Sequence, residues 1–151
     1  MTDPYYAACC QIKTPGYPTK EGLKDSVQKV RDFTAYAVGQ FSEMYPVKLV
    51  VFPEGMQGWW GEYHNNKDLL NIAIEIPGEE TDQLGEIAKK NRCYLAPGSW
   101  WENDPEYGLT FNAFPLFDPK GNLIMKYRKV NPWIPLEPTI SPFDIPDYKD
   151  E

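Results

Sequence analysis

The sequence is poor in histidine and cysteine, and this limits the chemistry open to it. His64 is the single histidine, so a Ser-His-Asp triad has one residue to draw on and a metal site built from several histidines is excluded. The three cysteines, Cys9, Cys10 and Cys93, are an odd number with two adjacent, which is a poor disulfide framework. Reduced thiols are typical of the cytoplasm, so we expect a cytoplasmic protein. Carboxylates, lysine and thiol remain as catalytic groups, and nothing in the sequence calls for a cofactor or metal.

Long apolar runs are also missing. The longest strongly apolar run, residues 49–52, is far too short to cross a bilayer, and the opening Met-Thr-Asp-Pro has neither the basic nor the apolar part of a secretory signal. Acidic residues outnumber basic ones by 22 to 15, and the formal net charge is -7. Because a negative surface repels phosphate, neither nucleic acid nor an anionic membrane is expected as a partner.

What is present is typical of one globular domain. The chain has 151 residues, of which 42% are hydrophobic and 25% charged. Runs of apolar, aromatic and β-branched residues bounded by turn residues predict strands, at residues 5–12, 47–52, 93–101, 109–117 and 123–129. Apolar residues three and four positions apart predict helices at 20–44, capped by Thr19, and at 81–91, and a shorter helix is expected at 67–74. This order predicts an α/β fold, a mixed sheet with helices packed on it.

The last two predicted strands form a hairpin, and the chain after it has a different texture. The linking residues Asp118-Pro119-Lys120-Gly121 place proline second and glycine fourth, as a type I turn prefers. From about residue 130 prolines recur every few positions, which argues against regular structure. We expect this tail to be a loop or an extended arm.

Three charged residues stand where they can serve a reaction. Glu54 follows the apolar strand and Pro53, and a partly desolvated carboxylate there can act as a general base, although many strand ends carry solvated acids. Lys129 ends the hairpin and can stabilise negative charge on a substrate oxygen, or simply keep a sheet edge soluble. Glu137 lies between prolines, which restrict the backbone and can hold its carboxylate in place; the alternative is a surface acid. Taken one at a time, each is more simply read as a surface charge.

Three separated segments, taken together, resemble the nitrilase/amidase superfamily of carbon–nitrogen hydrolases. The matching residues in chain order are Pro53-Glu54, Pro77-Gly78 with Thr81, Asn112, the turn at 118–121, and Tyr127-Arg128-Lys129. The run from 127 to 137 looks like the aliphatic amidase and formamidase branch in particular. The order and spacing of the segments reverse the reading of Glu54 and Lys129 as surface charges.

The resemblance implies a fold and a mechanism. Residues 1–151 are similar to the N-terminal half of an α-β-β-α sandwich, and a half-sandwich leaves one sheet face without its partner layer. Glu54 becomes the general base, Lys129 the cation facing the oxyanion, and Glu137 an additional carboxylate that helps to position the substrate. In such enzymes a cysteine thiolate attacks a small amide or nitrile, ammonia leaves, and water releases the acid from a thioester.

One element of the family pattern has no counterpart. The nucleophile of the family follows the lysine in a Cys-Trp/Tyr-Glu segment, and none of the 22 residues after Lys129 (151 − 129) is a cysteine. We therefore expect this chain to be inactive alone, as the product of a truncated gene, a fragment, or one piece of a split enzyme. Its expected partners are a complementary C-terminal half or further copies of itself. A scaffold or interaction subunit that keeps the fold without the chemistry is the alternative.

Overall fold

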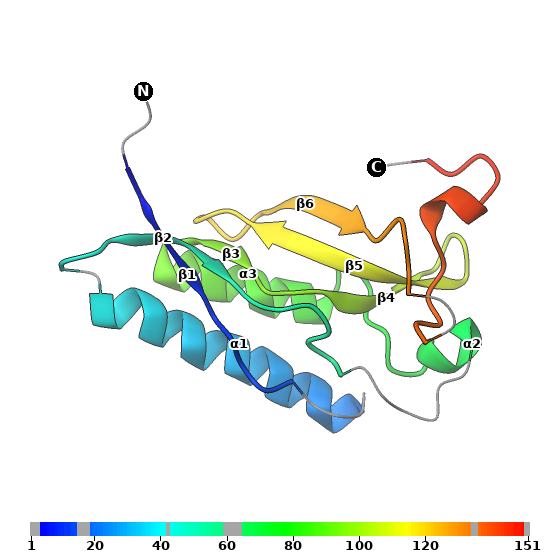
Figure 1. The fold of residues 1–151 in the computed structure, drawn as a ribbon, viewed down its shortest axis with the longest axis horizontal. Coiled ribbons are helices and arrows are strands. Elements are labelled where there is room, and N and C mark those ends of the chain that lie inside the picture. The colour runs from blue at the N-terminus through cyan, green and yellow to red at the C-terminus, as the bar shows by residue number, and fades with distance from the viewer. Residues whose placement is uncertain (1–3, 15–18, 42, 59–64, 134–135, 150–151) are drawn as a thin grey trace.

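The computed structural model describes residues 4–14, 19–41, 43–58, 65–133 and 136–149, so His64 lies outside the described residues (Figure 1). The strands are β1 (Tyr6–Cys9), β2 (Val47–Val51), β3 (Tyr94–Ala96), β4 (Trp100–Asp104), β5 (Leu109–Phe117) and β6 (Leu123–Arg128). The helices are α1 (Lys20–Phe41), α2 (Asn66–Leu69) and α3 (Glu79–Asn91), with one 3₁₀ turn, η1 (Pro142–Asp144). No helix in these ranges has the length and apolarity that crossing a membrane requires.

The strands form one mixed sheet, as predicted. β1 and β3 each pair with β2 in parallel, whereas β5 pairs antiparallel with β3, β4 and β6. Ala113 of β5 is paired with both Trp100 and Arg128, so β4 and β6 lie on opposite edges of β5. Phe117 is likewise paired with a residue of β3 and with one of β6. β3 and β4 therefore follow one another along the same edge of β5, and β6 lies along the other.

The single strand expected at 93–101 is wrong in one respect: it is broken between β3 and β4. Gly98 lies in the break with a φ of +82°, and a Cβ added there would lie 2.1 Å from the carbonyl oxygen of Pro53. The chain bends here, and the turn that follows β2 packs directly against its backbone. A side chain at position 98 would prevent this close packing.

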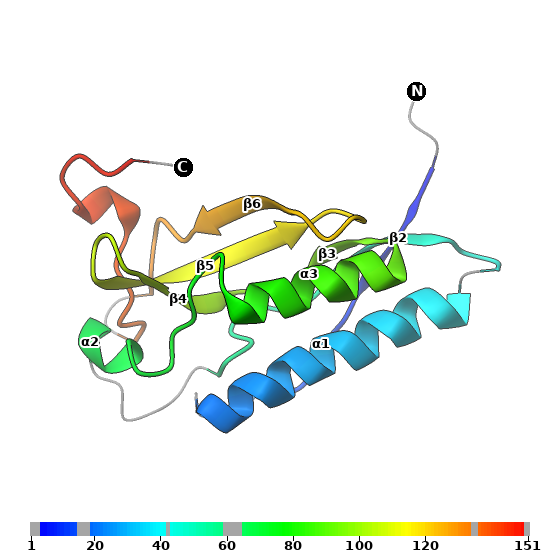
Figure 2. The same cartoon turned by 180° about the vertical axis from the view of Figure 1, so that it is seen from behind.

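Two helices cover one face of the sheet. α1 and α3 lie side by side below the strands in Figure 1 and again in the reverse view of Figure 2. The Thr19 hydroxyl accepts the Gly22 amide at 2.9 Å, so the predicted cap is confirmed. The buried apolar residues between helices and sheet include Val27, Val30, Val50, Leu84, Ile87, Leu95 and Phe117. This layer is the hydrophobic core of the chain.

The other face of the sheet carries neither α1 nor α3, and part of it is apolar. Its residues alternate along the strands with core residues and form direct cross-strand pairs. The pairs are Leu49 with Tyr94, Phe114 with Tyr127, and Leu116 with Met125. Tyr94 and Met125 are each 43% exposed and Tyr127 is 50% exposed. We call these six residues the open sheet face.

Several predicted boundaries differ from the observed ones. α1 ends at Phe41 rather than 44, β1 is shorter than the strand expected at 5–12, and α2 covers only the start of 67–74. The apolar pattern of the strand predicted at 5–12 favours buried thiols, but Cys9 is exposed and Cys10 half-buried. The reason is that β1 is an edge strand of a sheet with one uncovered face. After Lys129, the described residues form η1 and otherwise turns and irregular chain.

Candidate active site

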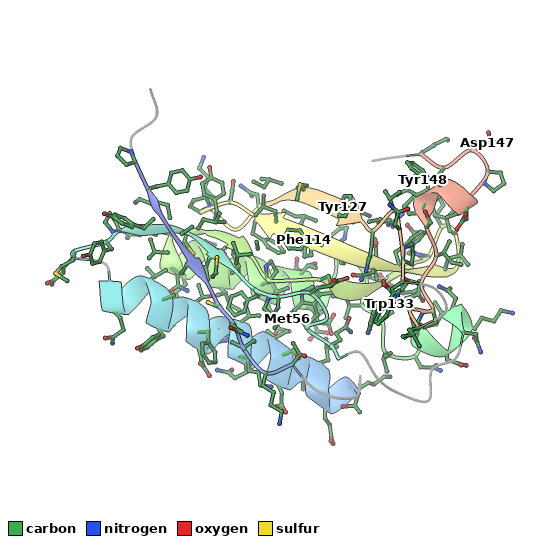
Figure 3. All side chains as sticks on the ribbon, in the orientation of Figure 1. Met56, Phe114, Tyr127, Trp133, Asp147 and Tyr148 are labelled. Atoms are coloured by element: carbon green, nitrogen blue, oxygen red, sulfur yellow. The ribbon has the colours of Figure 1, made fainter. Side chains whose placement is uncertain are left out.

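Glu54 lies in a turn, residues 53–58, that follows β2 and is fixed from two sides. The Ser26 hydroxyl of α1 donates to the carbonyl of Met56 at 2.6 Å. The Gly55 amide donates to the Ser99 hydroxyl at 2.9 Å, and the Met56 amide to the Ser99 carbonyl at 3.1 Å. Met56 is fully buried, and Figure 3 shows it between α1 and the strands. The position of Glu54 is therefore set by the core on one side and by the β3–β4 bend on the other.

Lys129 comes directly after β6, and its side chain reaches both predicted carboxylates. Its backbone amide donates to the carbonyl of Asn112 at 2.8 Å, which extends the β5–β6 ladder by one residue. Its ammonium Nζ lies 2.8 Å from Oε1 of Glu54 and 2.7 Å from Oε2 of Glu137. Glu54 and Lys129 are 75 positions apart in sequence. The three residues to which the resemblance assigns roles in one reaction, Glu54, Lys129 and Glu137, therefore lie together.

Glu137 is a buried carboxylate with a donor on every side. Its side chain is 1% exposed, and Oε2 accepts from Lys129 at 2.7 Å and from the backbone amide of Trp133 at 3.0 Å. Oε1 accepts from the Asn112 amide at 2.7 Å and from the Thr139 hydroxyl at 3.0 Å. Burial alone would raise the pKa of Glu137, but these donors, with Lys129 first among them, outweigh burial and lower it. Glu137 is a fixed negative charge.

Lys129 is held in its charged form by its two carboxylate neighbours. Its side chain is 26% exposed, and this partial burial by itself would lower the pKa. The hydrogen bonds and charges of Glu137 and Glu54 act in the opposite direction and raise the pKa above its usual value. An ammonium at this position is suited to stabilising an oxyanion.

Glu54 differs from Glu137 in being open to solvent and anchored through one oxygen. Its side chain is 46% exposed. Oε1 accepts both from Lys129 and from the Asn112 amide, each at 2.8 Å. No residue in the described part of the chain donates a hydrogen bond to Oε2. One oxygen is therefore fixed and the other is available to take a proton.

A cavity of about 300 Å³ adjoins these groups. It is lined by Glu54, Ser99, Asn112, Phe114, Tyr127 and Lys129. Phe114 and Tyr127 also belong to the open sheet face, and Figure 3 shows them on neighbouring strands. The size suits a small ligand. Among the described residues, no three His, Cys, Asp or Glu side chains are grouped so as to hold a metal ion.

Sequence reasoning used Asn112 only as part of a motif and gave it no role. In the structure its amide donates to both carboxylates and the residue is 3% exposed. A signal was present, because this asparagine stands in the middle of a mostly apolar strand and a buried polar side chain needs partners. The donors from Trp133 and Thr139 belong to an irregular loop, where no sequence pattern indicates that these residues contact Glu137.

A second buried charge cluster fixes the end of β6 next to Lys129. Arg128 forms a two-pronged ion pair with Glu102, with both N–O distances at 2.7 Å, and also pairs with Asp104. Its Nη1 donates to the Tyr148 hydroxyl at 3.0 Å, and its guanidinium lies 4.1 Å from the centre of the Phe111 ring. Tyr148 belongs to the C-terminal segment, which lies over the end of the sheet in Figure 3. The cluster ties that segment to the strand that carries Lys129.

Comparison with known proteins identifies relatives over most of the chain. Residues 6–146 match the model of the carbon–nitrogen hydrolase family. Formamidases of Bacillus cereus (strain B4264) and Bacillus thuringiensis (strain Al Hakam) are 38% identical over 136 and 123 residues, which cover 89% and 80% of this chain. The same matches cover 39% and 36% of the formamidases, so the chain spans well under half the length of these relatives.

Solved structures share the fold. A carbon–nitrogen hydrolase from Helicobacter pylori G27 matches with a TM-score of 0.66 and 21% identity over 84% of this chain and 40% of that one. Saccharomyces cerevisiae Nit3, a member of branch 10 of the nitrilase superfamily, matches with a TM-score of 0.63 and 24% identity over 82% and 44%. At such identities the likeness is one of fold, and it confirms the predicted nitrilase-like α/β arrangement.

Proposed function

Because the chain belongs to the carbon–nitrogen hydrolase family, we propose that it supplies three polar side chains to the hydrolysis of a small amide. Glu54 is the general base, Lys129 faces the oxyanion, and Glu137 is the fixed counterion of Lys129. One observation carries the proposal: an ammonium lies 2.8 Å from one carboxylate and 2.7 Å from another, and the three residues come from separate segments of the chain. Residues 1–151 then form part of a larger hydrolase domain.

In the proposed chemistry Glu54 transfers the protons and Lys129 stabilises the oxyanion. Oε2 of Glu54 takes the proton of a cysteine thiol, and the thiolate attacks the amide carbon while the carbonyl oxygen becomes an oxyanion beside the Lys129 ammonium. The proton on Glu54 passes to the departing nitrogen, and ammonia leaves a thioester. Glu54 then takes a proton from water, which attacks the thioester. Glu54 returns that proton to the departing thiolate sulfur, so that the acid and the thiol are released.

No cysteine is among the described residues that line the cavity, and we propose that a segment outside the 151 residues supplies it. The substrate class follows from the relatives named formamidase and from the size of the cavity, about 300 Å³, which suits a small aliphatic amide or nitrile. The three cysteines fit a reducing compartment, so we propose that the reaction takes place in the cytoplasm.

The competing function is a scaffold or interaction subunit that keeps the fold and has lost the chemistry. The observation that favours it is that the described lining of the cavity contains no cysteine. The two functions differ in what they require of Glu54 and Lys129, because a scaffold needs neither proton transfer nor oxyanion stabilisation.

The test uses an assembled enzyme, which we define as this chain fused to the cysteine-bearing segment of a formamidase relative. In it, Glu54→Gln is expected to lower kcat/KM for formamide by about 10²- to 10⁴-fold, because the thiol has no base. Lys129→Gln is expected to lower it by about 10²- to 10³-fold, because the oxyanion loses its cation. Both are measured by ammonia release, with mass spectrometry to detect the acyl-cysteine.

Matched controls are available on α3, where Glu86 and Lys89 form an exposed ion pair. Glu86→Gln and Lys89→Gln make the same chemical changes away from the cavity and are expected to leave kcat/KM unaltered. Full activity of the Lys129→Gln enzyme would overturn the mechanism, and full activity of Glu54→Gln would remove the proposed base.

The open sheet face is the basis of the proposed assembly. A cluster of exposed apolar side chains is typical of an interface, and Phe114 and Tyr127 belong both to this face and to the cavity lining. We propose that the complementary half of a hydrolase, or in its absence a second copy of this chain, covers this face. Whatever covers it also closes the cavity from that side.

The 151-residue chain is therefore expected to self-associate, as measured by sedimentation velocity. Met125→Asp, which places a charge on the open sheet face, is expected to shift the protein toward the monomer. Phe33→Asp is the matched control, because Phe33 is 44% exposed, close to the 43% of Met125, but lies on α1. A compact wild-type monomer that binds no hydrophobic dye would contradict the proposal.

A further inference from the structure

We infer that Asn112 is a positioning residue of this site, whose side-chain amide bridges the two carboxylates and determines which oxygen of Glu54 receives the proton. The inference deepens the proposed function and rests on it. Asn112 stands in β5, paired with Trp101 of β4, so its backbone is fixed by the centre of the sheet.

The amide nitrogen of Asn112 serves both carboxylates at once. Nδ2 lies 2.8 Å from Oε1 of Glu54 and 2.7 Å from Oε1 of Glu137. A primary amide has two N–H hydrogens and a carboxylate only accepts, so each hydrogen has one carboxylate as its acceptor. The backbone carbonyl of the same residue accepts the Lys129 amide at 2.8 Å. One residue therefore contacts all three members of the cluster.

The neutrality of the amide matters for the chemistry. Two carboxylates and one ammonium give the cluster a net charge of about −1, and the amide adds two donors without changing it. A lysine or arginine at position 112 would instead cancel the remaining negative charge. An apolar residue would leave two carboxylates close together with one donor fewer each.

The amide also fixes the orientation of Glu54. Lys129 alone can follow either oxygen of a carboxylate that is 46% exposed, because its ammonium sits on a flexible stem. Asn112 is 3% exposed and belongs to a strand, so it gives Oε1 a second, rigid donor. With Oε1 held by two donors, Oε2 is the oxygen presented to the thiol.

The first test measures kcat and KM separately in the assembled enzyme. Asn112→Leu keeps the branched shape of the side chain and removes both donors, and it is expected to lower kcat by about 10²-fold with little change in KM, the cost of a misplaced catalytic group. Thr139→Val is the matched control, because Thr139 donates to Glu137 at 3.0 Å and makes no hydrogen bond to Glu54. We expect its loss in kcat to be less than about tenfold.

A second variant separates donation from packing. Asn112→Asp has the shape of asparagine, but an ionised carboxylate only accepts, and a protonated one regains a single donor. Its kcat relative to that of the wild type is expected to rise as the pH falls. A ratio that stays constant or falls as the pH falls would count against hydrogen-bond donation from position 112.

The third measurement uses the 151-residue chain and does not depend on activity. Carbon-13 NMR titration of Glu137 is expected to show a higher pKa in both Asn112→Leu and Thr139→Val, since each loses one of the donors that lower it. An unchanged pKa of Glu137 in Asn112→Leu would overturn the assigned bridge. If Asn112→Leu kept the kcat of the wild type while Glu54→Gln was inactive, the positioning role would be wrong. An active Glu54→Gln enzyme would instead disprove the proposed function.

Discussion

Ammonia release from formamide by the 151-residue polypeptide alone is expected to remain at the uncatalysed background. When residues act as a unit, loss of the nucleophile can cost as much as loss of the whole set, on the order of a millionfold in a serine hydrolase. Glu54 and Lys129 can polarise and orient an amide, but neither replaces a thiolate at carbon. Fusing the cysteine-bearing segment of a formamidase relative is expected to raise the rate by a comparable factor.

The three cysteines present are poorly placed to act as the nucleophile. Burial raises the pKa of Cys93 to about 11, and the residue is fully buried. Burial, with a smaller contribution from Cys9, also raises the pKa of Cys10. Cys9 is exposed, but it lies on edge strand β1 and does not belong to the described lining of the cavity. Activity needs the thiolate, so none of the three is expected to form an acyl intermediate.

Mass spectrometry after incubation with substrate is the direct measurement, because an acyl adduct reports which thiol reacted. The fusion with its added cysteine changed to serine is the control, and it should return to the background of the single chain. Turnover by the chain alone, or an adduct on Cys9, Cys10 or Cys93, would show that the nucleophile has been assigned to the wrong part of the molecule.

Replacing Glu102 with alanine is expected to lower the free energy of unfolding by about 3–5 kcal/mol, the usual cost of removing one partner from a buried ion pair. Glu102 is 1% exposed and pairs with Arg128, which is 5% exposed, and with Lys126 at 3.0 Å. The substitution leaves a guanidinium and an ammonium without their shared carboxylate. Asp104 still pairs with Arg128 but is itself partly exposed, so it compensates only in part.

Urea denaturation gives the measurement, as a lower midpoint at an unchanged slope. Glu86→Ala removes the acid from the exposed Glu86–Lys89 pair, which has an N–O distance of 3.1 Å, and is the matched control. Its midpoint is expected to stay close to that of the wild type, since exposed pairs contribute little. Equal effects of the two substitutions would show that the Arg128 cluster is no more important for stability than a surface pair.

The meeting of Glu54 and Lys129 was predictable because each follows a strand of recognisable pattern. The strand pattern indicates where each strand ends. The turn at 118–121, in which the Gly121 amide donates to the Asp118 carbonyl at 2.9 Å, determines how β6 returns along β5. Glu137 was predicted less firmly from its own segment. Its burial depends on donors from Trp133 and Thr139 in a loop without periodicity, so local pattern could not reveal it.

Two errors have different physical origins. The break between β3 and β4 had a signal, because Pro97-Gly98 is a turn dipeptide, but both halves pair with β5 and so share the apolar pattern of one strand. The exposure of Cys9 had no such signal. The residues of a strand do not by themselves indicate whether another layer of structure covers the sheet at that edge.

The glycine at position 98 affects how Glu54 should be aligned with glutamates in related sequences. An L-residue there would have to adopt a φ of +82° and would place its Cβ 2.1 Å from the Pro53 carbonyl oxygen. The residue would have to accept this φ and also avoid the Pro53 oxygen. Avoiding that contact requires the turn that carries Glu54 to move. A homologue with a side chain at this position has therefore rebuilt that turn. In such a homologue an aligned glutamate is not evidence of an equivalent base, whereas a glycine there is compatible with the same loop path.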